Sequence, residues 1–417
     1  MQSSAWSLGY REAKAIALII AVVLWTIAAV FWIGGTGYRS VAGPLKGGDF
    51  VQFYAMGAVV ADDPRTNLYD IKRLHAVQTA LVPESDPELY LPVYPPQSWL
   101  VFAPFTALPY GVAAAVWTLI LVGGYAAMVR ASWRTLSADL PDGRFVAFAA
   151  AAFPPFWNLV VNGQNTIIPL LAFFLAWRAI ENNRRVVAGL ALGLLFFKPQ
   201  FGLALAVVVL AGGEWAMLAG LAVAAAAHVG IVAATTGVSS LVDYVAFMRE
   251  VTAVEYLIEP DPFELHSIRS LARLAPDWLA APLWLVGSAV VLERTVRVWR
   301  SGADVLVRLG VLLLATVLVS PHLFAYDAAV LSLALLWIGA WMQRTRAMLP
   351  QAADRFWRGV PLLYATFLFP IAHIIKVQIS VLVMIWLVFM LTSAVRTATA
   401  ARDPDAAPHP SIRPGLG

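Results

Sequence analysis

Cysteine is absent from all 417 residues, and charged residues are scarce, at 13% of the chain. The missing cysteines exclude disulfides, thiolate metal sites and cysteine nucleophiles. A soluble domain is typically about a quarter charged and about half apolar, whereas this chain is 60% apolar. A water-soluble core of this size could not bury so much apolar surface, so the composition predicts a protein that lies in lipid.

Motifs that bind soluble nucleotides or catalytic zinc are also missing. The chain contains no GxxxxGK(S/T) loop, no GxGxxG turn after a strand and no HExxH helix. The net charge of +4 does not indicate a nucleic-acid partner, because Arg and Lys cluster in short loops between apolar segments. Any enzyme here is expected to use a lipid-borne donor and no cofactor. No metal ligands are assigned, and an ion that bridges a donor phosphate and Asp327 is the alternative.

Long apolar segments recur along the whole chain, and they predict an all-α, polytopic membrane helical bundle with about 12 transmembrane helices. The predicted crossings lie near residues 13–33, 99–129, 145–160, 165–180, 186–197, 200–212, 216–236, 279–293, 305–320, 325–341, 359–374 and 377–395. Residues 99–129 are long for one crossing, so we expect a short half-helix there, followed by a full span.

The charges between these segments predict the topology. Arg-rich loops alternate with acidic or neutral ones, which is the positive-inside pattern of a multi-pass protein in the cell (plasma or inner) membrane. Both termini are then cytoplasmic, and residues 34–96 and 237–277 form outer loops that we expect to carry amphipathic helices. We predict a single domain over residues 1–400 and a disordered cytoplasmic tail over residues 401–417, where proline is frequent.

Asp49 directly follows two glycines in the first outer loop. Apolar residues at helical spacing come after it, including Phe50 and Tyr54, and they predict a helix that lies in the membrane interface. A carboxylate held at that surface is well placed to act as a general base. The alternative is a helix cap, since Asp is a favoured N-cap residue.

Lys198 stands in an apolar stretch with no acidic neighbour in the sequence. An ionisable residue in such a place is a functional hypothesis by default, and an ammonium suits a phosphate as a compact point charge. The alternative is a lysine whose long stem reaches the membrane surface without a chemical role.

Two further polar groups follow predicted spans on the outer side. The segment from Ser320 to Asp327 places His322 and Tyr326 four residues apart, so they would share one face if the second helix has already begun at His322. This segment could handle protons or phosphate, or could equally be a polar turn that satisfies helix ends. The turn at Asn162 and Gln164 could bind sugar hydroxyls or simply cap a helix.

One polar pair, His266-Ser267, precedes an amphipathic piece of the second outer loop, where a surface capping motif would explain it as well.

Taken together, these segments resemble the glycosyltransferases of family 87, enzymes of the GT-C fold that use a polyprenyl-phosphate sugar. The resemblance rests on short pieces in order, spread over most of residues 45–330: Gly48-Asp49-Phe50, Asn67-Leu68-Tyr69-Asp70, Tyr94-Pro95-Pro96, Ala103-Pro104, Leu108-Pro109, Asn162-Gly163-Gln164-Asn165, Lys198-Pro199, His266-Ser267-Ile268 and Ser320-Pro321-His322. The chain departs from the family where Leu265-His266-Ser267 stands in place of the frequent Asn-Gln-Ser, and in the residues that follow His322.

The resemblance implies an inverting transfer of mannose, or a related sugar, from a polyprenyl-phosphate donor to a hydroxyl of a lipid or glycan acceptor. Asp49 matches the acidic residue taken as the family's base. We expect the donor phosphate to contact Lys198, His322 and Arg269. The residues expected to contact the sugar or the acceptor are Tyr54, Asn162, Gln164, His266, Ser267, Tyr326 and Asp327.

A membrane transporter or flippase for a lipid-linked sugar is the competing class of protein, because the same polar residues could line a pathway. Transporters often show internal repeats with broken helices at matching positions of two halves. The sequence shows no such repeat, and the long loop after the first span favours the enzyme.

Overall fold

The computed structural model describes residues 4–253, 259, 261–369 and 371–401, and these residues are predominantly helical. The longer helices are α1 (Ser4–Ile33), α2 (Phe50–Asp62), α3 (Ile71–Leu81), α5 (Tyr110–Leu136), α8 (Ile167–Glu181), α10 (Gly202–Ala211), α11 (Trp215–Thr235), α12 (Ser239–Ala253), α15 (Asp277–Arg300), α16 (Val305–Val319), α17 (Leu331–Arg344), α18 (Pro350–Leu368) and α20 (Ile379–Ala400). The shorter α-helices are α4 (Gln97–Phe102), α6 (Gly143–Ala151), α7 (Pro154–Val161), α9 (Arg185–Leu192), α14 (Ile268–Ala272) and α19 (Ile371–Ile375).

Short 3-10 turns η1 (Pro83–Ser85), η2 (Ala103–Ala107), η3 (Gly193–Phe197), η4 (Pro199–Phe201), η5 (Pro262–Glu264) and η6 (Asp327–Val330) join or extend them. Within the described part of the chain, the β pairing amounts to one isolated bridge between Arg39 and Leu45.

The length of the helices does not confirm twelve crossings. Five of the described helices are long and apolar enough to cross a membrane, namely α1, α5, α11, α15 and α20, and the pair α6 and α7, bent by 51° at a short break, would make six. The break falls at Pro154 and Pro155, which cannot continue the hydrogen-bonding ladder of α6. Several other predicted crossings correspond to apolar helices of 10–17 residues, which are short for a bilayer of about 30 Å.

The surface of the bundle supports a multi-pass membrane protein. Large apolar side chains point outward on the long helices, such as Ile19 on α1, Leu119 on α5 and Val286 on α15. A soluble protein rarely exposes contiguous apolar surface on this scale, so these faces fit contact with lipid. α16 lies at the centre instead, with 13 of its 15 residues buried, and α10, α15, α17 and α20 pack against it.

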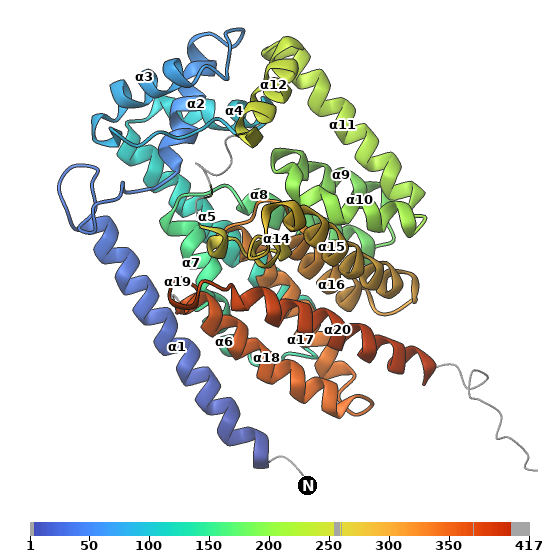
Figure 1. Cartoon of the computed structure of the whole chain (residues 1–417). Helices are drawn as coiled ribbons and strands as arrows, with labels where there is room; N and C mark the ends of the chain where they lie inside the picture. Colours follow the sequence, from blue (N-terminus) through green and yellow to red (C-terminus); the bar gives the residue numbers. More distant parts are fainter. Residues whose placement is uncertain (1–3, 254–258, 260, 370, 402–417) are drawn as a thin grey trace, which may run out of the picture.

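Several helices in or next to the two predicted outer loops, residues 34–96 and 237–277, lie at one end of the molecule. Figure 1 shows α2, α3, α4 and α12 together at the end opposite the N-terminus, and the ring of Tyr69 stacks on that of Phe247 of α12 at 5.5 Å. As expected for residues 99–129, the short helix α4 precedes the full-length helix α5. The predicted tail lies outside the described residues from residue 402 onward.

The prediction that the helix after Asp49 lies in the membrane interface is wrong. Ten of the 13 residues of α2 are buried, because α3, α4 and η2 cover it. Its rings pack inward: Phe50 stacks on Trp117 at 6.0 Å and Phe53 stacks on Phe102 at 4.5 Å. α2 is therefore a core element that holds the preceding loop, and α3, with only Leu74 and Gln78 buried, is the helix that meets solvent.

The predicted orientation has a direct test in this cysteine-free chain. Ala42, in the predicted first outer loop, and Ala347, in the turn between α17 and α18, are both exposed. Cysteine at Ala42 should react with a membrane-impermeant maleimide in intact cells, and cysteine at Ala347 only after permeabilisation. The reverse pattern would overturn the orientation predicted from the Arg-rich loops.

Candidate active site

Asp49 lies where two loops that are far apart in the sequence meet backbone to backbone. The N–H of Asp49 donates to the carbonyl of Asn162 at 2.8 Å. Gly48 and Gly163 both have positive φ, and a Cβ on Gly163 would lie 2.1 Å from the carbonyl oxygen of Gly47. Glycine is required at these positions because the contact leaves no room for a side chain.

Two aromatic side chains of α5 fix the same junction from outside. The indole N–H of Trp117 donates to the carbonyl of Gly163 at 2.9 Å, and the hydroxyl of Tyr110 donates to the carbonyl of Lys46 at 2.8 Å. These hydrogen bonds therefore fix the backbone on both sides of Asp49.

The side chain of Asp49 does not cap α2. It precedes the helix with α-helical φ and ψ and forms no capping hydrogen bond. Its carboxylate instead accepts from the side-chain amide of Gln164 at 2.5 Å, while the residue remains partly exposed. Burial raises the pKa of Asp49, and the Gln164 hydrogen bond and the charge of Lys198 offset part of that rise. The geometry is thus that of an oriented carboxylate rather than of a helix cap.

Lys198 sits behind Gln164 in a buried polar network. Its ammonium donates to Asp327 at 2.6 Å, to Thr166 at 3.0 Å and to the amide oxygen of Gln164 at 3.3 Å. The side chains of Lys198 and Asp327 are each only 2% exposed. Three acceptors match the three N–H groups of an ammonium. The structure therefore brings Asp49, Gln164, Lys198 and Asp327 together as one connected group.

Two members of this network were not singled out as functional from the sequence. Tyr94 donates its hydroxyl to the amide oxygen of Gln164 at 3.0 Å, and the hydroxyl of Thr166 lies 2.6 Å from Asp327. Thr166 directly follows the polar turn at Asn162–Asn165, so its proximity to that turn was the available signal. Tyr94 stood among the family-like segments without an assigned role.

His322 and Arg269 meet in a second cluster, around the carboxylate of Glu259. Nδ1 of His322 contacts Glu259, and Arg269 and Arg273 reach the same carboxylate at 3.2 and 3.3 Å. Arg269 also donates to the carbonyl of Pro321 at 2.7 Å. The Glu259 side chain is only 2% exposed, whereas His322 and the arginines are more open. Two guanidinium groups and an imidazole thus surround one acid, so cationic groups are in excess.

Tyr326 lies between the two clusters. Its ring is 5.3 Å from the Lys198 ammonium and 5.7 Å from the ring of Phe324, which in turn contacts His322. Tyr326 and Phe324 therefore form a chain of contacts from Lys198 in the first cluster to His322 in the second.

Three other residues predicted to contact the sugar or the acceptor, Tyr54, Asn162 and His266, use their side chains elsewhere in the fold. The hydroxyl of Tyr54 donates to the carbonyl of Leu108 at 2.8 Å, and the amide of Asn162 donates to Asn158. Asn162 therefore binds Asp49 through its backbone carbonyl, whereas its side chain binds Asn158 in the last turn of α7. Tyr54 packs within the aromatic core beside Phe50, at 6.3 Å between the ring centres.

His266, which directly precedes Ser267 and α14, joins the predicted second outer loop to α20. Its ring stacks on Phe367 at 4.5 Å, and Nδ1 lies 2.8 Å from the hydroxyl of Ser380. Burial lowers the pKa of His266 to about 3, so the imidazole is neutral at physiological pH. Ser267 is fully buried beside it. Over the described residues, no three His, Asp or Glu side chains gather in a way that could hold a metal ion.

The structure is thus that of a helical membrane protein in which Gln164 orients one carboxylate, Asp49, and a second cluster of two arginines and a histidine surrounds Glu259. The chain belongs to Glycosyltransferase family 87, whose sequence pattern matches residues 93–321. That match includes Gln164 and Lys198 and ends one residue before His322, and Asp49 lies outside it.

Two curated relatives carry the same description. The chain is 28% identical over 286 residues to the polyprenol-phosphate-mannose-dependent alpha-(1-2)-phosphatidylinositol pentamannoside mannosyltransferase of Mycolicibacterium smegmatis, a match that covers 65% of this chain and 64% of the relative. It is 30% identical over 156 residues to the protein of that description from Mycobacterium tuberculosis, covering 36% of this chain and 33% of that relative. The chain thus spans less than two thirds of the relatives it matches. No solved structure matches.

Proposed function

We propose that this protein transfers mannose, or a related sugar, from a polyprenyl-phosphate donor to a hydroxyl of a lipid or glycan acceptor on the outer side of the membrane. The observation that carries the proposal is the environment of the Asp49 side chain, in a chain that belongs to family 87. Asp49 as a residue is partly exposed, and its carboxylate is oriented by Gln164 and is not used as a helix cap. The printed names of the two relatives supply the donor class.

Asp49 acts as the general base of a single displacement. Its carboxylate takes the proton of the acceptor hydroxyl while the acceptor oxygen forms a bond to the anomeric carbon of the sugar. The bond from that carbon to the phosphate oxygen breaks, and its electron pair leaves with the polyprenyl phosphate. Because attack and departure occur on opposite faces of the sugar, the anomeric configuration inverts.

Gln164 is the residue that positions this base. It donates to Asp49 and accepts from Tyr94 and Lys198, so its amide cannot rotate without losing several hydrogen bonds. Orientation of a reacting group in advance lowers the barrier without further reorganisation. Lys198 and Asp327 act behind Gln164, and the positive charge of Lys198 favours the ionised form of Asp49.

His322 and Arg269 hold the departing phosphate, with Arg273 beside them. Charge grows on the phosphate oxygens as the sugar leaves, and cationic donors placed there stabilise that charge. An arginine fork suits a phosphate because it can donate two parallel hydrogen bonds. A direct contact of Lys198 with the phosphate, predicted from the sequence, would require its pair with Asp327 to open.

The proposal is tested with membranes from cells that produce the protein. Radiolabelled polyprenyl-phosphate mannose should give a new labelled lipid or glycan that control membranes lack, whereas labelled GDP-mannose, added after the endogenous polyprenyl-phosphate mannose synthesis has been inhibited, should give none. Transfer from GDP-mannose alone would contradict the lipid-borne donor.

A further inference from the structure

A large cavity lies at the end of the molecule opposite Asp49. Its volume is about 2230 Å³, and helices α1, α5, α6 and α18 contribute its walls. α5 begins beside the Asp49 loop, where Tyr110 bonds Lys46, and its last turns, including Arg130 and Trp133, line the cavity. None of the residues of the candidate active site lines it.

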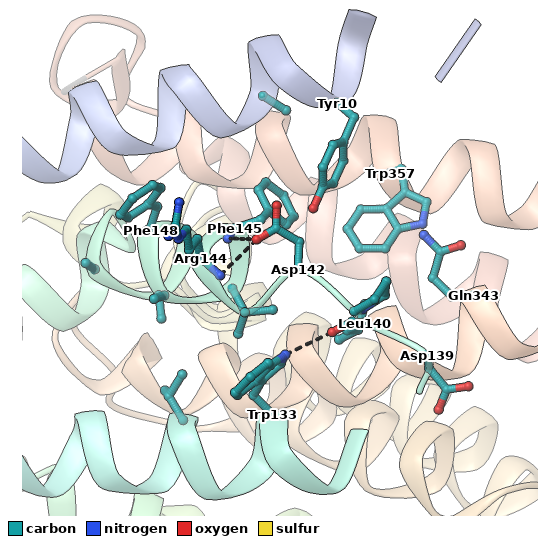
Figure 2. Close-up of a pocket in the computed structure, with 18 of the residues that line it drawn as sticks. Tyr10, Trp133, Asp139, Leu140, Asp142, Arg144, Phe145, Phe148, Gln343 and Trp357 are labelled. Atoms are coloured by element: carbon teal, nitrogen blue, oxygen red, sulfur yellow. Dashed lines mark hydrogen bonds between the residues drawn. The ribbon is translucent and has the colours of Figure 1, made fainter. Parts of the chain in front are cut away.

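The walls change character along the length of the cavity. Aromatic and aliphatic side chains line its inner part, including Trp25, Val122 and Phe156. Polar side chains line its outer part, namely Asp139 and Asp142 in the loop that leads from α5 to α6 and Arg144 at the start of α6, all three of which are labelled in Figure 2. From Gly9 to Trp25, both on the wall, α1 rises about 24 Å at 1.5 Å per residue. Because α1 is long and apolar enough to cross a membrane from Gly9 to Ile33, the cavity follows a large part of that candidate span.

Every carboxylate on the wall already has a cationic partner. Asp142 pairs with Lys14 at 2.6 Å, Asp139 with Arg344 at 2.7 Å, and Asp354 with Arg346 at 2.9 Å. Lys14 lowers the pKa of Asp142 to about 2, so that carboxylate stays ionised. Asp142 also caps α6, as its bonds to the N–H groups of that helix in Figure 2 show.

Three arginines on the wall are left with positive charge that no wall carboxylate balances. Arg130, Arg144 and Arg358 are exposed, and none of them forms an ion pair within the described part of the chain. Basic pockets between transmembrane helices bind anionic lipid headgroups. The charged rim suits the phosphate of such a headgroup, and the apolar inner wall suits its acyl chains.

We propose that this cavity binds an anionic phospholipid of the leaflet opposite the active site, with its phosphate held by Arg130, Arg144 and Arg358. The lipid fills the space between α1 and the rest of the bundle, where α1 buries few of its own side chains. It thereby fixes α1, whose other end leads into the Asp49 loop. The proposal does not depend on the transferase activity.

The test is native mass spectrometry of the full-length protein in detergent, titrated with phosphatidylglycerol or with phosphatidylcholine of the same acyl chains. The wild-type protein should bind phosphatidylglycerol at least about tenfold more tightly. Each of Arg130→Gln, Arg144→Gln and Arg358→Gln should weaken that binding about fivefold, and the triple variant should abolish the preference. The single variants keep the test decisive if the triple variant folds poorly.

A matched control removes three positive charges from arginines outside the cavity. Arg184, Arg355 and Arg396 are exposed and do not line the cavity, so replacing all three by Gln should leave the preference unchanged. Equal binding of the two lipids, or equal losses in the two triple variants, would overturn the proposal. Displacement of phosphatidylglycerol by an equimolar amount of inorganic phosphate would also contradict it, because the site would then recognise a free anion.

Discussion

Asp49→Asn should lower sugar transfer by about two to four powers of ten while leaving the melting temperature unchanged. The change keeps the size of the side chain and an oxygen that can accept from Gln164, but it removes the ability to accept the acceptor's proton. Because Asp49 forms no capping hydrogen bond, the loss cannot come from an unravelled α2. The measurement is turnover of labelled polyprenyl-phosphate mannose by the purified variant.

The control is Asp63→Asn, which alters an exposed carboxylate at the other end of α2 and should be nearly silent. The pH dependence adds a second readout. The base acts when deprotonated, and burial raises the pKa of Asp49. Transfer should therefore be present above that pKa and fall on acidification at a higher pH than an ordinary aspartate, near 4, would give. Near-normal turnover by a stable Asp49→Asn protein would rule out the general base.

Lys198→Ala should destabilise the protein by about 3–5 kcal/mol, because it leaves the carboxylate of Asp327 buried without its partner. Lys198→Arg should not restore stability, since a guanidinium overfills a site in which the ammonium is 2% exposed. Replacing the whole pair, as in Lys198→Met with Asp327→Leu, should recover most of the loss. Lys72→Ala, on the exposed face of α3, is the control and should change the melting temperature little.

The double variant also separates two roles of Lys198. If Lys198 acts through Asp327 and Gln164, the restored protein keeps its affinity for the donor, and kcat falls because Asp49 is less well oriented. A stable double variant whose KM for the donor rises about tenfold or more would instead place Lys198 on the phosphate. A Lys198→Ala protein as stable as the wild type would contradict the ion pair itself.

The helices were predictable from the sequence because apolar runs and proline breaks are local signals. The predicted segment at 145–160, for example, corresponds to α6 and α7. The environment of α2 was not predictable, since apolar residues at helical spacing look alike on an interfacial helix and on a buried one. α2 is buried because α4 and η2 cover the face that would otherwise be exposed, and the sequence of α2 alone does not show those contacts.

The site was predictable as a set of residues but not as a set of contacts. Asp49, Gln164 and Lys198 were all singled out, yet Gln164 reaches Asp49 across 115 residues and Lys198 reaches Asp327 across 129. Lys198 therefore has an acidic partner in space, Asp327, although no acidic residue lies near it in the sequence. Glu259 was missed because nothing in its neighbourhood links it to His322, which lies 63 residues further on.

The most direct test of the account is transfer by the purified protein in detergent, where no membrane separates two compartments. A transporter or flippase forms no new product under those conditions, because it only moves its substrate between two sides of a membrane. A transferase needs only its donor and its acceptor. With labelled polyprenyl-phosphate mannose and a lipid extract as the acceptor source, we expect a labelled product whose anomeric configuration is opposite to that of the donor. A protein that binds the donor and stays folded but forms no product with any acceptor fraction, or forms one of retained configuration, would contradict the displacement based on Asp49.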